Sequence, residues 1–219
     1  MHDETDIRMA RYFGALIENR GVIANQHASR VGMITYVLAE KLMSLFPEYE
    51  LTESRVRMIA SAASLHDVGK LKVSDSIINK ASRMTDQEYE AYQSHTYKGK
   101  KMFLDISKNI PDGDPDKEFF ELCASICMSH HEKYGGDGYP EGLKGDDIPI
   151  EAQLVGLADM YDDAVSDRMY KRAIPKLEAF EMIRNGEMGT ISPKLLQVFD
   201  ECRSSLEEII NKDEKNNTK

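Results

Sequence analysis

The sequence lacks the segments that would take a protein into or across a membrane. No apolar run approaches the ~20 residues that span a bilayer, and no signal-peptide pattern opens the chain. Cysteine is scarce as well, because three residues, an odd number, make no disulfide framework. We therefore expect a cytoplasmic protein without membrane association.

Two of the cysteines, Cys123 and Cys127, lie four residues apart, directly before the pair His130 and His131. This spacing on one helical face is compatible with a mixed zinc site. The favoured interpretation is that both cysteines are small buried residues of a core helix.

A basic excess is also missing. The chain has 28 Lys and Arg residues against 38 Asp and Glu residues, which gives a formal net charge of −10. A general nucleic-acid surface needs basic side chains to neutralise phosphates, so this class of partner is excluded. A small anionic ligand is not excluded, because a local basic cluster and bound metal ions can supply the positive charge.

Alternating apolar and polar residues, the pattern of strands, form no segment of any length. Apolar residues recur three and four apart instead, and residues 71–84 are expected to form a loop. We expect an all-α bundle in a single domain over residues 1–210. Residues 1–20 would form a helix, either a linker-derived coil or part of the bundle, and 211–219 a disordered polar tail. The expected helices cover 5–19, 26–46, 53–65, a segment capped at Thr85 that carries His95, a segment from about 117 to His130, 150–165, 175–185 and a last one that begins at Ser192 and Pro193.

Seven side chains that can bind metals are spread between residues 27 and 159. Five of the six histidines in the chain belong to this set. Nitrogen and carboxylate ligands without thiolates favour redox-capable or borderline divalent metals, and one carboxylate can bridge two ions. The seven residues are His27, His66, Asp67, His95, His130, His131 and Asp159.

The local sequence supports a shared site. Adjacent residues of a helix point about 100° apart, so neighbours rarely share a metal from mid-helix. Gly69 lets the chain turn just after His66–Asp67, and His130–His131 stand where a helix meets a glycine-rich loop. Asp159 lies on a mostly apolar helix, where a buried carboxylate is costly without a cation. Each element alone has an ordinary structural interpretation, and their joint occurrence favours the metal site.

Six segments together form a long and specific set of motifs. They are HASRV (27–31), SLHDVGKLKVSDSIINK (64–80), HTYKGKKM (95–102), HHEKYGGDGYPEGLKGDDIP (130–149), ADMYDDAVSDRMYKR (158–172) and GEMGTISPKLL (186–196). This set resembles the HD-GYP family, a branch of the HD superfamily of metal-dependent phosphohydrolases, over nearly the whole chain. The resemblance implies an HD-type helical bundle that encloses a metal centre and hydrolyses cyclic di-GMP or a related cyclic dinucleotide.

The resemblance also implies a role for each residue of the site. Two divalent ions, iron or manganese by ligand type, are bridged by Asp67 and by a water or hydroxide. Lys70 is expected to be catalytic and to contact the substrate, and the loop residues Gly138 and Tyr139 to lie near it. Tyr139 either stacks on a guanine or only anchors the loop. The ligands of one ion are His27, His66 and Asp159, those of the other are His95, His130 and His131, and the further phosphate contacts are Arg168 and Lys171.

Three positions depart from the family pattern. Ile23 stands where some members carry a glutamate ligand for a third metal, so we expect two ions. Asp163 is an added carboxylate that either alters the charge of the pocket or faces water. The segment 189–193 reads GTISP where the family often has GTxFDP, a change that concerns packing rather than chemistry.

The resulting hypothesis is a phosphodiesterase that opens cyclic di-GMP to linear pGpG, with further cleavage to GMP left open. The alternatives are a catalytically silent cyclic-dinucleotide receptor and an HD phosphohydrolase that acts on another nucleotide. A third alternative is an output module controlled by a regulatory domain or by a signalling partner that contacts the glycine-rich loop. Whether the chain forms a homodimer is also left open.

Overall fold

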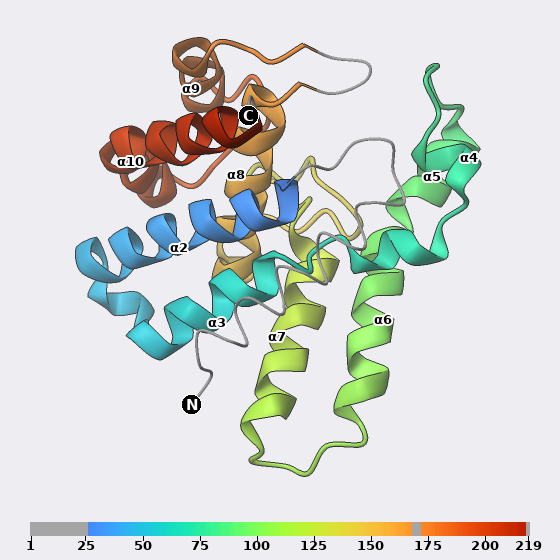
Figure 1. Cartoon of the computed structure of the whole chain (residues 1–219). Coiled ribbons are helices and arrows are strands. Elements are labelled where there is room, and N and C mark those ends of the chain that lie inside the picture. Colours follow the sequence, from blue (N-terminus) through green and yellow to red (C-terminus); the bar gives the residue numbers. More distant parts are fainter. Residues whose placement is uncertain (1–25, 168–171, 218–219) are drawn as a thin grey trace.

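The computed structural model describes residues 26–167 and 172–217, with side chains described to residue 212. This part of the chain contains helices and no strand, which confirms the predicted all-α class (Figure 1). The helix predicted over residues 1–20 lies outside the described residues. The helices are α2 (His27–Leu45), η1 (Pro47–Tyr49), α3 (Glu53–Ala63), η2 (Val68–Lys72), α4 (Asp75–Ile78), α5 (Asp86–Gln93), α6 (His95–Ser107), α7 (Pro115–Ser129), η3 (Gly145–Asp147), α8 (Ile150–Val165), α9 (Lys176–Arg184) and α10 (Pro193–Asn217).

Side-chain caps define several helix starts. The Thr52 side chain accepts a hydrogen bond from the backbone N–H of Arg55 at the start of α3. At α5, Thr85 and Glu88 form the reciprocal capping box that the sequence indicated. Such caps satisfy backbone groups that a helix end leaves unpaired, so these boundaries follow from the local sequence.

Three sequence expectations need correction. The single helix expected from Thr85 through His95 is two helices, because the chain breaks at Ser94 and α6 begins at His95. The expected loop 71–84 contains the short helix α4. Residues 211–217, expected to be disordered, continue α10. An ion pair between Lys212 and Glu208, one turn apart at 2.8 Å, supports the helix there.

The core lies where α2 packs against α3, α8 and α10, and where α7 packs against α6 and α8. Phe180 and Phe199 stack with ring centroids 3.9 Å apart, and Tyr161 packs edge-on against both. Cys123 and Cys127 are buried in this core, and burial raises the pKa of both thiols. The core interpretation of the two cysteines is therefore confirmed.

None of the described helices combines the length and the apolar character that crossing a bilayer requires.

One glycine sets the spacing around which the site is built. A Cβ at Gly69 would lie 1.8 Å from the carbonyl oxygen of His95 and 2.5 Å from the backbone nitrogen of Gly99. The backbone of η2 therefore touches the backbone of α6, an approach that any larger residue would block. This contact brings the chain that follows His66–Asp67 against the first turn of α6, where His95 lies.

Candidate metal centre

All seven predicted side chains come together in two adjoining groups. The segments that carry them are several helix ends and α8, which pass close to one another in the middle of the bundle (Figure 1). His27 and His95 begin α2 and α6, His66–Asp67 follow α3, His130–His131 follow α7, and Asp159 lies within α8. Within each of two groups, the potential ligand atoms all lie within 4.8 Å of one another. The first group is His27, His66 and Asp159, and the second is Asp67, His95, His130 and His131.

Asp67 lies between the two groups. Its Oδ1 is 3.3 Å from Nε2 of His95 and 3.8 Å from Nε2 of His130. Its other oxygen, Oδ2, is 3.3 Å from Nε2 of His66. One oxygen therefore faces each group, which is the arrangement that a bridging carboxylate needs.

The histidine rings are held from behind by backbone carbonyls. Nδ1 of His66 lies 2.8 Å from the carbonyl oxygen of Ala63, and Nδ1 of His95 lies 2.7 Å from that of Tyr92. Nδ1 of His130 likewise lies 3.0 Å from the carbonyl oxygen of Ile126. When Nδ1 donates its proton to a carbonyl, the lone pair of Nε2 is left to face inward.

The inward-facing atoms lack hydrogen-bond partners. Nε2 of His66, His95, His130 and His131 and Oδ1 of Asp67 are buried, and no described residue hydrogen-bonds to them. Buried polar atoms without partners destabilise a fold, and a cation among them would remove that penalty. The donor set therefore fits divalent metal ions.

The buried pair of Arg30 and Asp162, which the sequence did not indicate, holds the ring of His27 in place. Asp162 is fully buried, and its Oδ2 lies 2.7 Å from Nδ1 of His27. Arg30 donates to the same carboxylate through Nε at 2.6 Å and Nη2 at 3.0 Å. The available signal was spacing, because Asp162 lies three residues after Asp159 on α8 and so shares its face.

The neighbouring Asp163 is half exposed, with Oδ1 3.9 Å from Nδ1 of His27. It therefore both faces solvent and adds negative charge beside the first group. Ile23, the position that concerns a third ion, lies outside the described residues.

The two groups differ in proton affinity. Burial disfavours the charged form of His27, but hydrogen bonds to Asp159 and Asp162 outweigh it and raise its pKa to about 10. The pKa of His66 is also raised, because the attraction of Asp67 outweighs burial. In the second group, burial dominates and lowers the pKa of His130 to about 3.

Lys70 lies where the motif predicted it, beside the carboxylate shared by the two groups. Its amine donates to Oδ2 of Asp67 and is 5.6 Å from the centroid of the Tyr92 ring. Burial opposes the charge of Lys70, but Asp67 outweighs burial and raises the pKa of the amine. The other predicted phosphate contacts, Arg168 and Lys171, lie outside the described residues.

The glycine-rich loop is fastened to the histidine pair that precedes it. Buried Glu132 accepts hydrogen bonds from the backbone N–H groups of Glu141 at 2.7 Å and Leu143 at 3.0 Å. A Cβ at Gly138 would lie 2.5 Å from Cα of Glu132, so this glycine permits close approach of two backbone segments. The ring of Tyr139 stacks on His131, with centroids 4.6 Å apart and an interplanar angle of 26°.

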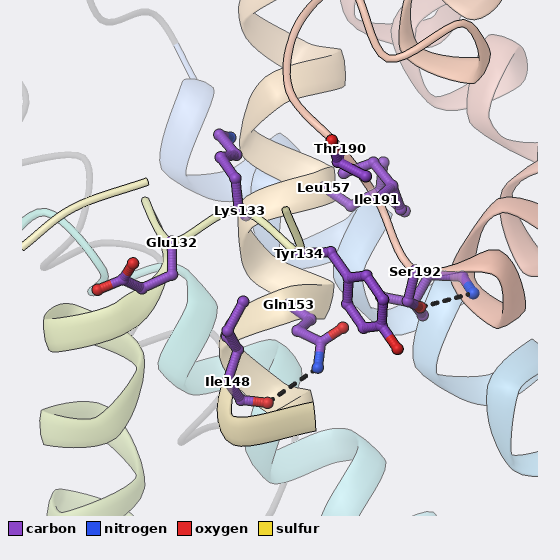
Figure 2. A pocket seen from close by; sticks show the side chains of 11 residues that line it. Glu132, Lys133, Tyr134, Ile148, Gln153, Leu157, Thr190, Ile191 and Ser192 are labelled. Atoms are coloured by element: carbon purple, nitrogen blue, oxygen red, sulfur yellow. Dashed lines mark hydrogen bonds between the residues drawn. The ribbon is translucent and has the colours of Figure 1, made fainter. Parts of the chain in front are cut away.

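A small pocket lies between the start of this loop, α8 and the segment 190–195 (Figure 2). Its lining includes Tyr134, Gln153 and Ser192 and none of the seven predicted ligands. Glu132 and Lys133 point away from each other at its edge. Burial lowers the pKa of Lys133, a cation near the site that the sequence reading did not single out.

The fold and the site together define a helical domain built around a metal-capable histidine and aspartate centre. The sequence model of the HD domain family matches residues 9–195 of this chain. The chain is 32% identical over 203 residues to a cyclic di-GMP phosphodiesterase of Thermotoga maritima, covering 93% of this chain and 51% of that protein. It is 31% identical over 196 residues to the 3'3'-cGAMP-specific phosphodiesterase 2 of Vibrio cholerae. This match covers 90% of this chain and 34% of that protein.

Among solved structures, Bd1817, an HDG"Y"P protein from Bdellovibrio bacteriovorus, superimposes with a TM-score of 0.58 at 20% identity, covering 89% of this chain and 61% of that one. The chain spans about half or less of the length of the two curated relatives. The chain belongs to the HD domain family.

Proposed function

We propose that this chain is a phosphodiesterase domain that hydrolyses a cyclic dinucleotide, with cyclic di-GMP as the first candidate and linear pGpG as the first product. The observation that carries the proposal is the position of Asp67, which directs one oxygen toward each of two groups of inward-facing imidazoles. Relatives named as phosphodiesterases for cyclic di-GMP and for 3'3'-cGAMP support this substrate class.

The proposed cofactors are two divalent ions, iron or manganese by ligand type. The first would be held by His27, His66 and Asp159 and the second by His95, His130 and His131, with Asp67 shared. When bound, such ions neutralise phosphoryl charge and lower the pKa of a coordinated water, which makes a nucleophile available near neutral pH.

The remaining residues bind and orient the substrate. Lys70 keeps its proton because of Asp67 and places a positive charge at the edge of the site. It would donate a hydrogen bond to a phosphoryl oxygen and transfer a proton to the leaving oxygen. Arg168 and Lys171 are proposed as further phosphate contacts, and Gly138 and Tyr139 as the loop wall beside the substrate.

The test is a product analysis of the full chain. The protein is loaded anaerobically with iron or with manganese and incubated with cyclic di-GMP, 3'3'-cGAMP and cyclic di-AMP, and the products are separated by chromatography. We expect cyclic di-GMP to be opened to pGpG. Tight binding of a cyclic dinucleotide without turnover of any would show a receptor instead. Neither binding nor turnover of any of the three would favour an HD phosphohydrolase that acts on another nucleotide.

A further inference from the structure

Three tyrosines lie beside the second ligand group. Tyr139 stacks on His131, and Tyr89 lies edge-on to Tyr139, with centroids 6.2 Å apart and an interplanar angle of 71°. Tyr92 packs edge-on against His95 at 5.2 Å. Two of these rings come from α5 and one from the glycine-rich loop, so the aromatic cluster joins segments about 50 residues apart in the chain.

The three rings differ in what already covers them. Tyr139 has one face against His131, and Tyr92 is partly buried beside His95. Tyr89 is 48% exposed, and α5, which carries it, has no buried residue. Tyr89 is therefore not a core residue, and its ring offers apolar surface beside Tyr139 rather than to the interior.

A cation, Lys70, lies between Tyr92 and Asp67. The amine of Lys70 contacts Asp67 on one side and lies 5.6 Å from the Tyr92 centroid on the other. A phosphate bound at the metals and Lys70 is joined to its base through a single sugar. The base must therefore come to rest within one sugar's reach of the phosphate. The tyrosine cluster borders the same ligand group, through Tyr139 on His131 and Tyr92 on His95.

We propose that Tyr89, with Tyr139 as the adjoining wall, forms the binding site for one purine base of the substrate, a role that rests on the proposed function. Aromatic side chains bind bases by stacking, because every base has a π-face. Tyr139 is then the ring that anchors the loop to His131, and Tyr89 is the ring that determines affinity for the base.

The first experiment uses fluorescence, because the chain contains no tryptophan. The variant Tyr89→Trp places a single reporter in the proposed base site. Tyr97→Trp is the matched control, because Tyr97 lies on α6, is 59% exposed and has no ring contact among the described residues. Each metal-loaded variant is titrated with GMP and with ribose 5-phosphate, which has the same sugar and phosphate but no base.

We expect GMP to quench Tyr89→Trp in a saturable manner, while ribose 5-phosphate leaves it unchanged and Tyr97→Trp responds to neither. An equal response of the two reporters to GMP, or no response of Tyr89→Trp, overturns the base site. This readout does not need turnover, so it decides the inference even if the chain hydrolyses no cyclic dinucleotide.

The second experiment measures steady-state kinetics. Tyr89→Ala should raise KM for the cyclic dinucleotide about tenfold and leave kcat nearly unchanged, since stacking contributes to binding rather than to the chemical step. Tyr89→Phe, which keeps the ring, should restore KM, and Tyr97→Ala should match the unmodified protein. A fall in kcat with unchanged KM in Tyr89→Ala would contradict the assignment. Absence of turnover in the unmodified protein would refute the proposed function alone.

Discussion

The two ligand groups differ in the charges that surround them. His27 of the first group lies between the carboxylates of Asp159 and Asp162, with distances of 3.2 and 2.7 Å from its two ring nitrogens. The second group contains three histidines, and Asp67 is the one carboxylate that the structure places within its ligand set. Proton affinity follows this difference, because the pKa is raised in His27 and lowered in His130.

The difference shows that histidines in one site need not be equally ready to bind a metal. A metal ligand must be deprotonated, so a proton competes with the ion for the same nitrogen. His130 is neutral at any pH near neutrality, whereas His27 holds a proton that its two carboxylates stabilise. An ion at the first group would therefore have to compete with a proton, whereas an ion at the second group would not.

The largest effect should come from removing the residue that the two groups share. Asp67→Ala deletes the carboxylate that faces both sets of imidazoles, so we expect loss of both ions and a fall in kcat of more than about a thousandfold. Metal analysis after anaerobic loading and a turnover assay measure this. The control is Asp200→Ala, which removes a surface carboxylate paired with Arg184 at 3.0 Å and should keep both ions. Full activity of Asp67→Ala would rule out the shared-carboxylate arrangement.

An intermediate effect should follow when the support of one group is removed. Asp162→Asn leaves Arg30 without its buried charge partner and weakens the hold on Nδ1 of His27. We expect the free energy of unfolding to fall by about 3 kcal/mol, because a buried ion pair is broken. We also expect the metal affinity of the first group to fall ten- to hundredfold, which is typical when a residue that hydrogen-bonds a metal ligand is changed. Urea unfolding and metal titration measure the two effects.

The adjacent variant Asp163→Asn removes one charge from the same turn of α8, but its side chain is half exposed. It should therefore change stability by much less than Asp162→Asn. Equal losses in the two variants would mean that general charge, rather than the buried contact with His27, sets the behaviour of the first group.

The last effect should appear as a difference in pH dependence between the two groups. With no ion bound, the folded pKa of His27, about 10, lies above its ordinary value of 6.5. The stability from its proton is therefore present below pH 6.5 and is lost as the pH rises through 10. Metal binding runs the opposite way, because affinity of the first group should fall about tenfold for each pH unit below that pKa.

Metal titrations between roughly pH 6 and roughly pH 8 compare the two groups directly. We expect one equivalent to bind with little pH dependence and a second equivalent to bind more tightly as the pH rises. Two equivalents that bind with identical pH profiles would remove the distinction between the groups.

Much of the site could be predicted from the sequence, because its signals are local. The pairs His66–Asp67 and His130–His131 stand at helix ends, and such ends can be read from a following glycine or a glycine-rich loop. The capping box of Thr85 and Glu88 was also legible. The class of the fold followed from apolar residues spaced three and four apart.

The parts that were missed depend on contacts between distant residues. The pair of Arg30 and Asp162 joins positions 132 residues apart, and no local pattern specifies such a contact. No proline or glycine marks the helix break at Ser94. Ser94 itself keeps helical backbone angles, so the break could not be recognised from the local sequence. The position of Tyr89 beside Tyr139 likewise depends on how the loop folds back, which the sequence of α5 does not encode.

Gly69 has a consequence for how this protein tolerates mutation. The atoms that a Cβ there would strike belong to the backbone of α6, and backbone cannot move aside as the end of a flexible side chain can. Even alanine would push α6, and His95 with it, away from the rest of the bundle. A survey of all substitutions should therefore rank position 69 among the least tolerant in the chain, although it contributes no chemical group. This intolerance would follow from the close contact between the main chain at Gly69 and the main chain of α6.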